Sequence, residues 1–210
     1  AVDLAAAAGP RGFSVRITGT DKLEDAAGAD VVVSTAGVAR KPGMDRMDLL
    51  RKNAEIAAGL AAGVREHALG ATVINVANPL DVICSVWLKE TGFSRERVLG
   101  MAGVLDSSRF RCFIAEALDC DPREVSAMVL GGHGDSMVPM LRTATVAGIP
   151  VTELVDEETL DAIVERTRKA GAEVVKLLQT GSAFSSTGAA AGQMVEAVLA
   201  GRPRLMPASA

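Results

Sequence analysis

The sequence predicts an α/β fold in which helices flank a mainly parallel sheet. Short runs rich in valine and isoleucine alternate with longer segments whose apolar residues recur every three or four positions. Two runs, 30–35 (DVVVST) and 71–76 (ATVINV), are almost continuously apolar, which is typical of strands buried on both faces. This alternation is most regular early in the chain, so we expect one domain over 1–104 and a second, mixed α+β domain over 105–210.

The first domain is expected to contain strands and helices in turn. The strands are predicted over 14–18, 30–35, 71–76 and 97–101. A long helix follows Asp45, whose carboxylate can accept the free amides of the first turn, and Gly70 ends it. A shorter helix is predicted over 81–89.

The second domain is expected to be richer in helix. A helix begins near Ser107, and a strand over 125–130 leads into a glycine-rich loop. Two further helices are predicted over 157–178 and 189–200, the second ending at Gly201. No internal repeat and no low-complexity linker interrupts this order.

Composition narrows the possible functions. The 210 residues are 49% hydrophobic and 23% charged with a formal net charge of −4, so we expect a globular protein with no nucleic-acid partner. The most apolar stretch, 71–88, is broken by polar residues and a proline, so we expect no membrane span. Three cysteines without a CxxC pair indicate reduced thiols, a cytoplasmic protein and no metal site.

His133 is the first candidate for chemistry. It lies in GGHGDSMVP, where a predicted strand ends in a glycine-rich loop, and the carboxyl ends of strands are where open α/β sheets bind ligands. An imidazole there can accept a proton near neutral pH. The alternatives are a histidine held by local hydrogen bonds, or a metal ligand paired with Asp135, although one such pair is too small for a metal site. The other histidine, His67, is expected at the surface of a helix.

Asp106 and Arg109 form a second candidate pair. They lie three residues apart in GVLDSSRFR at the start of a predicted helix, where both can share one face. The pair is read either as a helix-capping aspartate with a surface arginine, or as a carboxylate that orients an imidazole beside a guanidinium that binds a carboxylate.

Two loops at predicted strand ends carry further polar side chains. GVARKPGMDRMD places Arg40 and Arg46 between a buried strand and a helix, and VANPLD places Asn78 at the next strand end. The first loop is either a solvated basic loop or a binding site for a dianion, and the second is either a plain Asn-Pro turn or a ligand contact.

Four blocks, in this order and spacing, carry a resemblance to a known family: STAGVARKPGMDRMDLLRKNAEI, VINVANPLDV, GMAGVLDSSRFRCFIAEAL and VLGGHGDSMVP. Together they resemble the lactate/malate dehydrogenase family, most closely its bacterial lactate-dehydrogenase-like malate dehydrogenases. The resemblance covers essentially the whole chain. It implies a Rossmann-type parallel sheet followed by a substrate domain, NAD as the cofactor, and a homo-oligomer, dimer or tetramer.

The resemblance also implies a role for each candidate. His133 would accept the hydroxyl proton and Asp106 would hold its imidazole. Arg109 would bind the first carboxylate of the substrate, while Arg46 would polarise its carbonyl oxygen. Asn78 would hydrogen-bond the substrate oxygen. Contacts to the cofactor would come from Asn53, Val76, Ala77 and Asn78.

The resemblance also implies that Arg40 selects between the substrates of the family. Lactate dehydrogenases of the family carry a neutral residue at the matching position, whereas malate dehydrogenases carry arginine. A second guanidinium can pair the second carboxylate of oxaloacetate but finds no partner on pyruvate. The resemblance therefore implies reversible oxidation of (S)-malate to oxaloacetate. Alternatives are a lactate or other 2-hydroxy-acid dehydrogenase, and a non-catalytic module that keeps the fold.

The chain departs from the family pattern at both ends. It contains no GxGxxG, and the two strands expected around that motif are missing, as are elements expected after residue 210. We therefore expect an incomplete sheet in which the 14–18 strand has no partner and the 30–35 strand exposes an apolar edge. We also expect these 210 residues by themselves to bind NAD weakly and to turn over little substrate.

Overall fold

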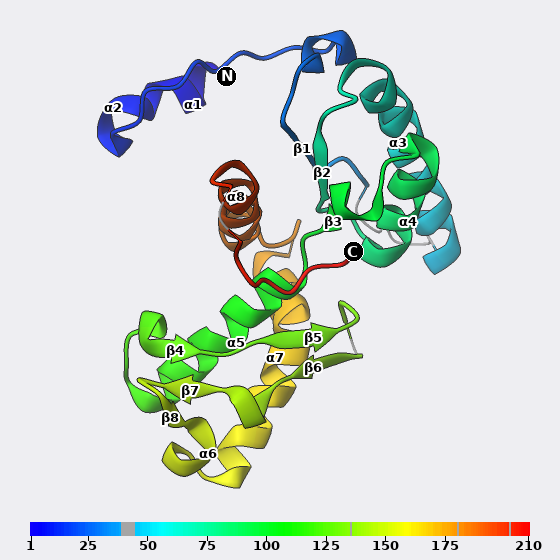
Figure 1. Cartoon of the computed structure of the whole chain (residues 1–210). Helices are drawn as coiled ribbons and strands as arrows, with labels where there is room; N and C mark the ends of the chain where they lie inside the picture. Colours follow the sequence, from blue (N-terminus) through cyan, green and yellow to red (C-terminus); the bar gives the residue numbers. More distant parts are fainter. Residues whose placement is uncertain (39–44, 135, 180, 202) are drawn as a thin grey trace.

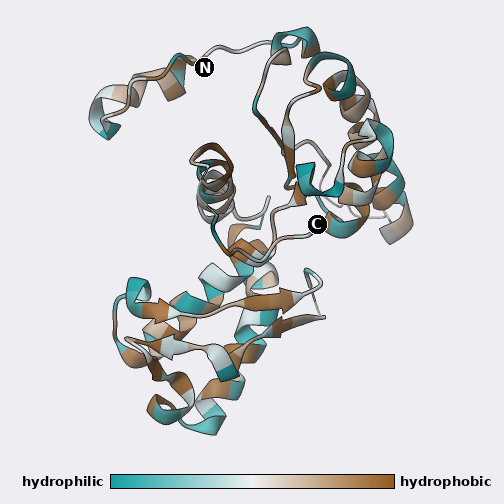
Figure 2. Cartoon of the chain, in the orientation of Figure 1, coloured by the Kyte–Doolittle hydropathy of each residue, from teal (hydrophilic) through white to brown (hydrophobic). Residues whose placement is uncertain are grey.

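The computed structural model describes residues 1–38, 45–134, 136–179, 181–201 and 203–210. Its elements form two groups (Figure 1). One group is a parallel sheet with helices on both faces, and the other is a set of short antiparallel strands packed against two long helices. In Figure 2 the strands of both groups are coloured mainly toward the hydrophobic end of the scale.

The parallel sheet has the order β1-β2-β3. Its strands are β1 (Val31–Ser34), β2 (Thr72–Asn75) and β3 (Val98–Gly100). Successive side chains of β2 point to opposite faces, because Val73 and Ile74 are both fully buried but belong to different apolar clusters. This central strand therefore needs helices on both of its faces.

Helices α3 (Arg46–His67) and α4 (Leu80–Thr91) cover one face, and α8 (Ser185–Leu199) covers the other (Figure 1). The predicted cap of α3 is present: the Asp45 carboxylate accepts the Asp48 amide at 2.6 Å, and Asp48 accepts the Asp45 amide in return. Because α8 comes late in the chain, the second half of the sequence completes the core of the first.

The second group is built on two helices, α5 (Gly103–Leu118) and α7 (Glu157–Leu178), which lie side by side in Figure 1. A hairpin and a small three-stranded sheet pack on them, followed by the short helix α6 (Val151–Leu154). The hairpin strands are β5 (Val129–Gly131) and β6 (Met137–Pro139). The sheet strands are β4 (Val125–Ser126), β7 (Thr145–Val146) and β8 (Ile149–Pro150). Phe110 and Ile114 of α5 form the fully buried centre of this group.

Four of the predicted elements need correction. Residues 14–18 form no strand, because nothing in the described sheet pairs beyond β1 and an isolated strand cannot satisfy its backbone. The expected strand over 125–130 is two strands in different sheets. Helix α5 begins at Gly103 and not near Ser107, and α8 begins at Ser185 and not at 189.

The edge of the sheet is exposed as predicted. β1 is the terminal strand of its sheet, and Val33 on that strand remains 39% exposed. The expectation that the 30–35 run is buried on both faces was therefore wrong, whereas the 71–76 run forms the buried strand β2. The first two helices, α1 (Val2–Ala6) and α2 (Ala8–Arg11), bury no residue and lie apart from both groups (Figure 1). No helix within the described part of the chain is long and apolar enough to cross a membrane.

Candidate active site

Three of the predicted site residues meet in one hydrogen-bonded group. His133 Nδ1 lies 2.8 Å from Asp106 Oδ2, and Arg109 Nη1 lies 3.3 Å from Asp106 Oδ1. The Asp106 side chain is 2% exposed, whereas those of His133 and Arg109 are 25% and 13% exposed. A buried carboxylate thus sits between two partly exposed groups that can each reach a ligand.

Helix α5 supplies two members of this group. Asp106 lies in the first turn of α5, where the positive end of the helix dipole favours a negative charge, and Arg109 follows one turn later on the same face. Arg109 Nη1 lies 3.8 Å from the position that a Cβ atom on Gly171 of α7 would occupy. The guanidinium is therefore held between the two long helices of the second group.

The loop of the β5-β6 hairpin supplies His133. Gly131, at the end of β5, has a φ of +81°, which favours glycine. A Cβ atom at Gly131 would lie 2.5 Å from the Ser136 carbonyl oxygen, and one at Gly132 would lie 2.5 Å from Ser136 Oγ. The two glycines therefore allow the tight turn that brings the imidazole back over Asp106.

Asn53 joins the carboxyl ends of two strands of the parallel sheet. Its side chain is buried on α3, and its Oδ1 accepts the Val38 amide at 2.8 Å. Its Nδ2 donates to the Asn78 carbonyl at 2.7 Å and to the Val38 carbonyl at 3.3 Å. Both amide hydrogens of Asn53 are thus used within the protein, and they hold together the loops that follow β1 and β2.

The loop after β2 contains the other predicted cofactor contacts. The Val76 amide donates to the Ser34 carbonyl at 2.8 Å, and the Ala77 amide donates to Asn75 Oδ1 at 3.2 Å. Asn78 itself is exposed. Its side chain is therefore available at the same edge of the sheet, while the backbone before it is held in place.

A small pocket connects this sheet edge with His133. The C-terminal segment closes it, because Ser209 exchanges two backbone hydrogen bonds with Gly100 and its Oγ donates to Asp81 Oδ1 at 2.7 Å. Sequence reasoning did not identify Asp81 or Ser209, since only the fold brings residues 81, 100 and 209 together. The pocket is lined by Leu80, Asp81, Ala102, Gly103, Val129, Leu130, Gly131, His133, Pro207, Ala208 and Ser209.

Two predicted substrate-binding arginines cannot be placed. Arg40 and the side chain of Arg46 lie outside the described residues, although the backbone of Arg46 begins α3.

Near the sheet edge, burial raises the pKa of the Cys84 thiol, which keeps it protonated and makes it a poor nucleophile near neutral pH. No group of three or more potential metal ligands occurs among the residues that the structure describes.

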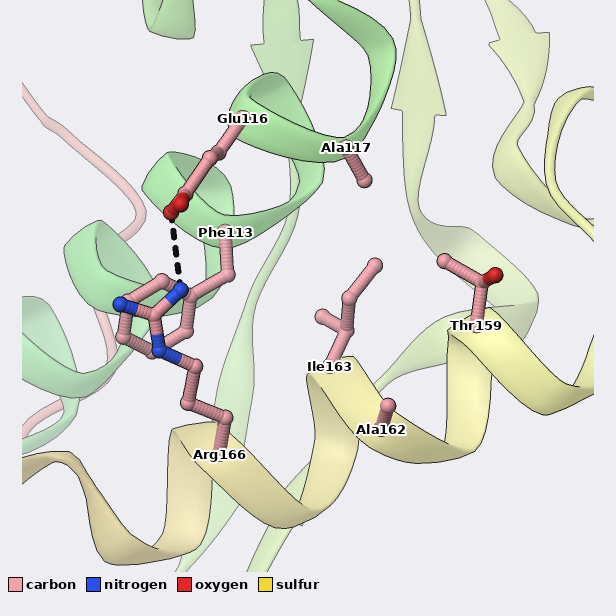
Figure 3. A pocket seen from close by; sticks show the side chains of 7 residues that line it. All are labelled: Phe113, Glu116, Ala117, Thr159, Ala162, Ile163 and Arg166. Atoms are coloured by element: carbon pink, nitrogen blue, oxygen red, sulfur yellow. Dashed lines mark hydrogen bonds and ion pairs between the residues drawn. The ribbon is translucent and has the colours of Figure 1, made fainter.

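A second hollow lies away from these residues, between α5 and α7 (Figure 3). Its floor is mainly apolar, and the Arg166 guanidinium stacks over the Phe113 ring at 4.1 Å while pairing with Glu116 at 2.8 Å. None of the predicted site residues lines it. It therefore plays no part in the arrangement around His133.

Comparison with known families divides the chain into two matching parts. Residues 1–100 match the NAD binding domain of lactate/malate dehydrogenase. Residues 103–210 match the α/β C-terminal domain of the same family. Together these matches cover nearly every residue of the chain.

Individual relatives agree with these matches. The malate dehydrogenases of Methanosarcina mazei and Myxococcus xanthus are 51% and 50% identical over the whole chain, which spans 68% and 67% of their lengths. The structure of apo malate dehydrogenase from Picrophilus torridus matches with a TM-score of 0.95 and 40% identity, covering 99% of this chain and 66% of that one.

A lactate dehydrogenase is almost as similar in structure. The Cryptosporidium parvum enzyme, with lactic acid and nicotinamide adenine dinucleotide bound, gives a TM-score of 0.94 and 41% identity, covering 100% of this chain and 68% of that one. Family models, curated relatives and solved structures all agree on one assignment. The chain belongs to the lactate/malate dehydrogenase family of NAD-dependent oxidoreductases.

Proposed function

We propose that this protein catalyses the reversible oxidation of (S)-malate to oxaloacetate, with NAD as hydride acceptor and His133 as proton acceptor. The observation that carries the proposal is the buried Asp106 carboxylate, with one oxygen at His133 and the other at Arg109. Alcohol oxidation by hydride transfer needs a base for the hydroxyl proton and a cation to hold the acid. This arrangement supplies both within one helix and one loop.

The pairing with Asp106 prepares His133 to act as the base. A carboxylate can only accept, so Nδ1 carries the hydrogen and the Nε2 lone pair is left for the substrate hydroxyl. As the imidazole takes up the proton, the negative charge of Asp106 stabilises the resulting cation. In the reverse reaction the same nitrogen returns the proton to the oxygen.

The cationic groups define the substrate. Arg109 would bind the C1 carboxylate with parallel hydrogen bonds, and Arg40 would pair the second carboxylate of a four-carbon diacid. Arg46 would polarise the carbonyl oxygen, and Asn78 would hydrogen-bond the same oxygen. These roles follow the family's motifs, residue by residue.

The described residues fit the nicotinamide end of NAD. The loops after β1 and β2 lie at one edge of the sheet, where Asn53 holds them together, and His133 lines the small pocket next to β3. Contacts to the cofactor would come from the backbone of Val76, Ala77 and Asn78, and the buried Asn53 would contribute by holding this loop in place. When bound, NAD supplies the hydride acceptor, while the residues of this chain orient the substrate and move its proton.

Two observations favour malate, and one favours a second candidate. Arginine stands at position 40, where a neutral pyruvate methyl group would leave its charge unpaired, and the curated relatives at about half identity are malate dehydrogenases. The similarity to a lactate dehydrogenase at a TM-score of 0.94 supports lactate as the alternative substrate.

Substitution of Arg40 separates the two candidates. The rates with oxaloacetate and with pyruvate are compared at saturating NADH, in the chain and in a chimera completed with the parts of the M. mazei relative that this chain does not cover. We expect Arg40→Gln to lower kcat/KM for oxaloacetate by about 10²-fold or more and to raise the pyruvate-to-oxaloacetate ratio. Arg11→Gln, on the remote helix α2, is the matched control. An unchanged ratio in Arg40→Gln would remove Arg40 from substrate selection.

The NAD affinity of the 210 residues is a separate prediction. They contain no GxGxxG, the motif whose backbone amides bind the pyrophosphate at a helix N-terminus. We expect calorimetry to show NAD binding at least about tenfold weaker for these residues alone than for the chimera, with little malate turnover. Equal affinity and full turnover in both would contradict this expectation.

We further propose a division into a cofactor domain over 1–104 and a substrate domain over 105–210. The junction of the two family matches between residues 100 and 103 supports this division. By the same family reasoning we propose a cytoplasmic homo-oligomer, dimer or tetramer.

A further inference from the structure

A buried hydroxyl next to Asp106 makes a contact that the proposed mechanism does not use. Ser107 follows Asp106 on α5 and is 6% exposed. Its Oγ accepts the backbone amide of Val129 at 2.9 Å. Val129 is the first residue of β5, and His133 lies four positions later, in the loop that β5 leads into. The bond therefore joins the two segments that carry the acid and the base.

The geometry of the hairpin explains why the Val129 amide needs this partner. In an antiparallel pair, hydrogen-bonded and non-hydrogen-bonded positions alternate. The Met140 amide donates to the Met128 carbonyl at 2.9 Å, so the next pair, Val129 with Pro139, is non-hydrogen-bonded. The Val129 amide thus points away from β6. Because Val129 is 1% exposed, its amide is shielded from bulk water and depends on the Ser107 hydroxyl as its partner.

The same bond sets where the His133 loop begins. β5 pairs only with the short strand β6 among the described strands, so the hairpin has no larger sheet to fix its position on α5. Apolar packing of Val129 is non-directional, whereas the hydrogen bond fixes one amide at one hydroxyl. A shift of the hairpin along α5 would change the 2.8 Å separation of His133 Nδ1 and Asp106 Oδ2.

We propose that Ser107 is a positioning residue whose hydroxyl holds β5, and with it the His133 loop, against the helix that carries Asp106. The inference rests on the His133–Asp106 pair of the proposed function. It adds a residue that touches neither substrate nor cofactor and acts on the imidazole through the backbone of β5.

The test measures the tautomer of His133 and needs no turnover. The chain has only two histidines, so nitrogen NMR of the imidazoles at about pH 8.5, where an ordinary imidazole is neutral, resolves His133 with His67 as an internal reference. We expect Nδ1–H to predominate in His133 of the unmodified chain. In Ser107→Ala the ratio of the Nδ1–H to the Nε2–H tautomer should fall by about 3- to 10-fold, as expected when a hydrogen bond of ordinary strength is weakened.

Three further variants make the result specific. Ser107→Cys is similar in shape, slightly larger, and accepts hydrogen bonds weakly, so it should give a smaller shift in the same direction. It also provides the test if Ser107→Ala does not fold. Ser107→Thr keeps the hydroxyl and should retain the ratio of the unmodified chain. Thr91→Val is the matched control, because the buried Thr91 Oγ1 also accepts a backbone amide, that of Phe93 at 3.2 Å, but far from His133.

The outcomes separate positioning from simple stabilisation. A lower melting temperature in Ser107→Ala and Thr91→Val, with a changed His133 tautomer only in the Ser107 variants that lose the hydroxyl, supports the proposal. An unchanged His133 tautomer in Ser107→Ala and Ser107→Cys overturns it. Because the readout is independent of malate oxidation, failure here is distinguishable from failure of the proposed function.

Discussion

At the scale of single residues, the site depends on the Asp106 carboxylate, whose two oxygens have different partners. Oδ2 of Asp106 faces His133, and Oδ1 faces Arg109. The side chain is almost fully buried, so its charge is screened little by solvent and both interactions are stronger than they would be in water. The carboxylate therefore orients the base and the substrate-binding cation at the same time.

Replacing Asp106 by asparagine tests this dual role. The amide keeps the shape but carries no charge to stabilise the protonated imidazole, so we expect kcat for malate oxidation in the chimera to fall by about 10²- to 10⁴-fold. Asp121→Asn, at an exposed aspartate after the end of α5, should leave kcat within about twofold. Comparable rates for Asp106→Asn and Asp121→Asn in steady-state assays would show that Asp106 has no part in proton transfer.

At the scale of elements, side chains at helix N-termini stabilise the helices by accepting the free backbone amides of the first turn. The Asp156 carboxylate caps α7 by accepting the Thr159 amide at 2.9 Å. Hydrogen bonds from the Thr159 backbone and side chain lower the pKa of Asp156 from its ordinary value of 3.8. A carboxyl group whose pKa is lowered on folding stabilises the folded state while it is ionised.

This cap should make the stability of α7 depend on pH in a defined direction. The contribution of Asp156 is fully present above about pH 3.8, the ordinary value, and is lost as the pH falls through the lower folded pKa. We expect Asp156→Ala to lower the melting temperature at pH 7, with the difference from the unmodified chain shrinking below about pH 3.8. Asp161→Ala, at an exposed position inside α7, is the control. A difference that stays constant down to pH 2 in thermal unfolding would contradict the capping role.

Sequence reasoning predicted elements and site residues to different extents. The buried strand β2 and the cap of α3 followed from local patterns, and so did the candidates His133, Asp106 and Arg109. The run 30–35 was predicted to be just as buried, but its burial depends on a neighbouring strand that the described sheet does not contain. The division of 125–130 between two sheets did not follow from local patterns, because both pieces are apolar and only their pairing partners differ. Ser107 and Ser209 were missed for a similar reason. Their hydroxyls form hydrogen bonds with the Val129 amide and the Asp81 carboxylate, and only the fold brings these partners close.

At the scale of the whole molecule, a shared apolar cluster joins the two groups of elements. It contains Ile74 of the sheet, residues at the start of α5, and Ala190, Ala191 and Met194 of α8. Helix α8 therefore covers the sheet of the first group although it follows the second in sequence (Figure 1). We expect the two groups to unfold together, since separating them would expose this cluster to water.

A destabilising substitution in the core of one group should then lower the unfolding midpoint of the other group as well. Phe110 is fully buried in the second group, so Phe110→Ala should cost about 3–5 kcal/mol. The single tryptophan, Trp87, is buried in the first group and reports its unfolding by fluorescence. We expect the urea midpoint of Trp87 to fall in step with the circular dichroism midpoint. Phe184→Ala, at a 70% exposed phenylalanine, should change the free energy of unfolding by less than about 0.5 kcal/mol. A Trp87 midpoint that Phe110→Ala leaves unmoved would mean that the groups unfold independently.

The sequence by itself determined the α/β class, the buried central strand, the family and the residues able to carry acid–base chemistry, because periodicity and side-chain chemistry are local properties. The tertiary structure alone decided that residues 14–18 form no strand and that α8 covers the sheet. It also showed that Asp106, His133 and Ser107 form one connected unit. These features depend on contacts between segments far apart in the chain, and a hydrogen bond or an apolar face has no fixed partner until the backbone brings one within reach.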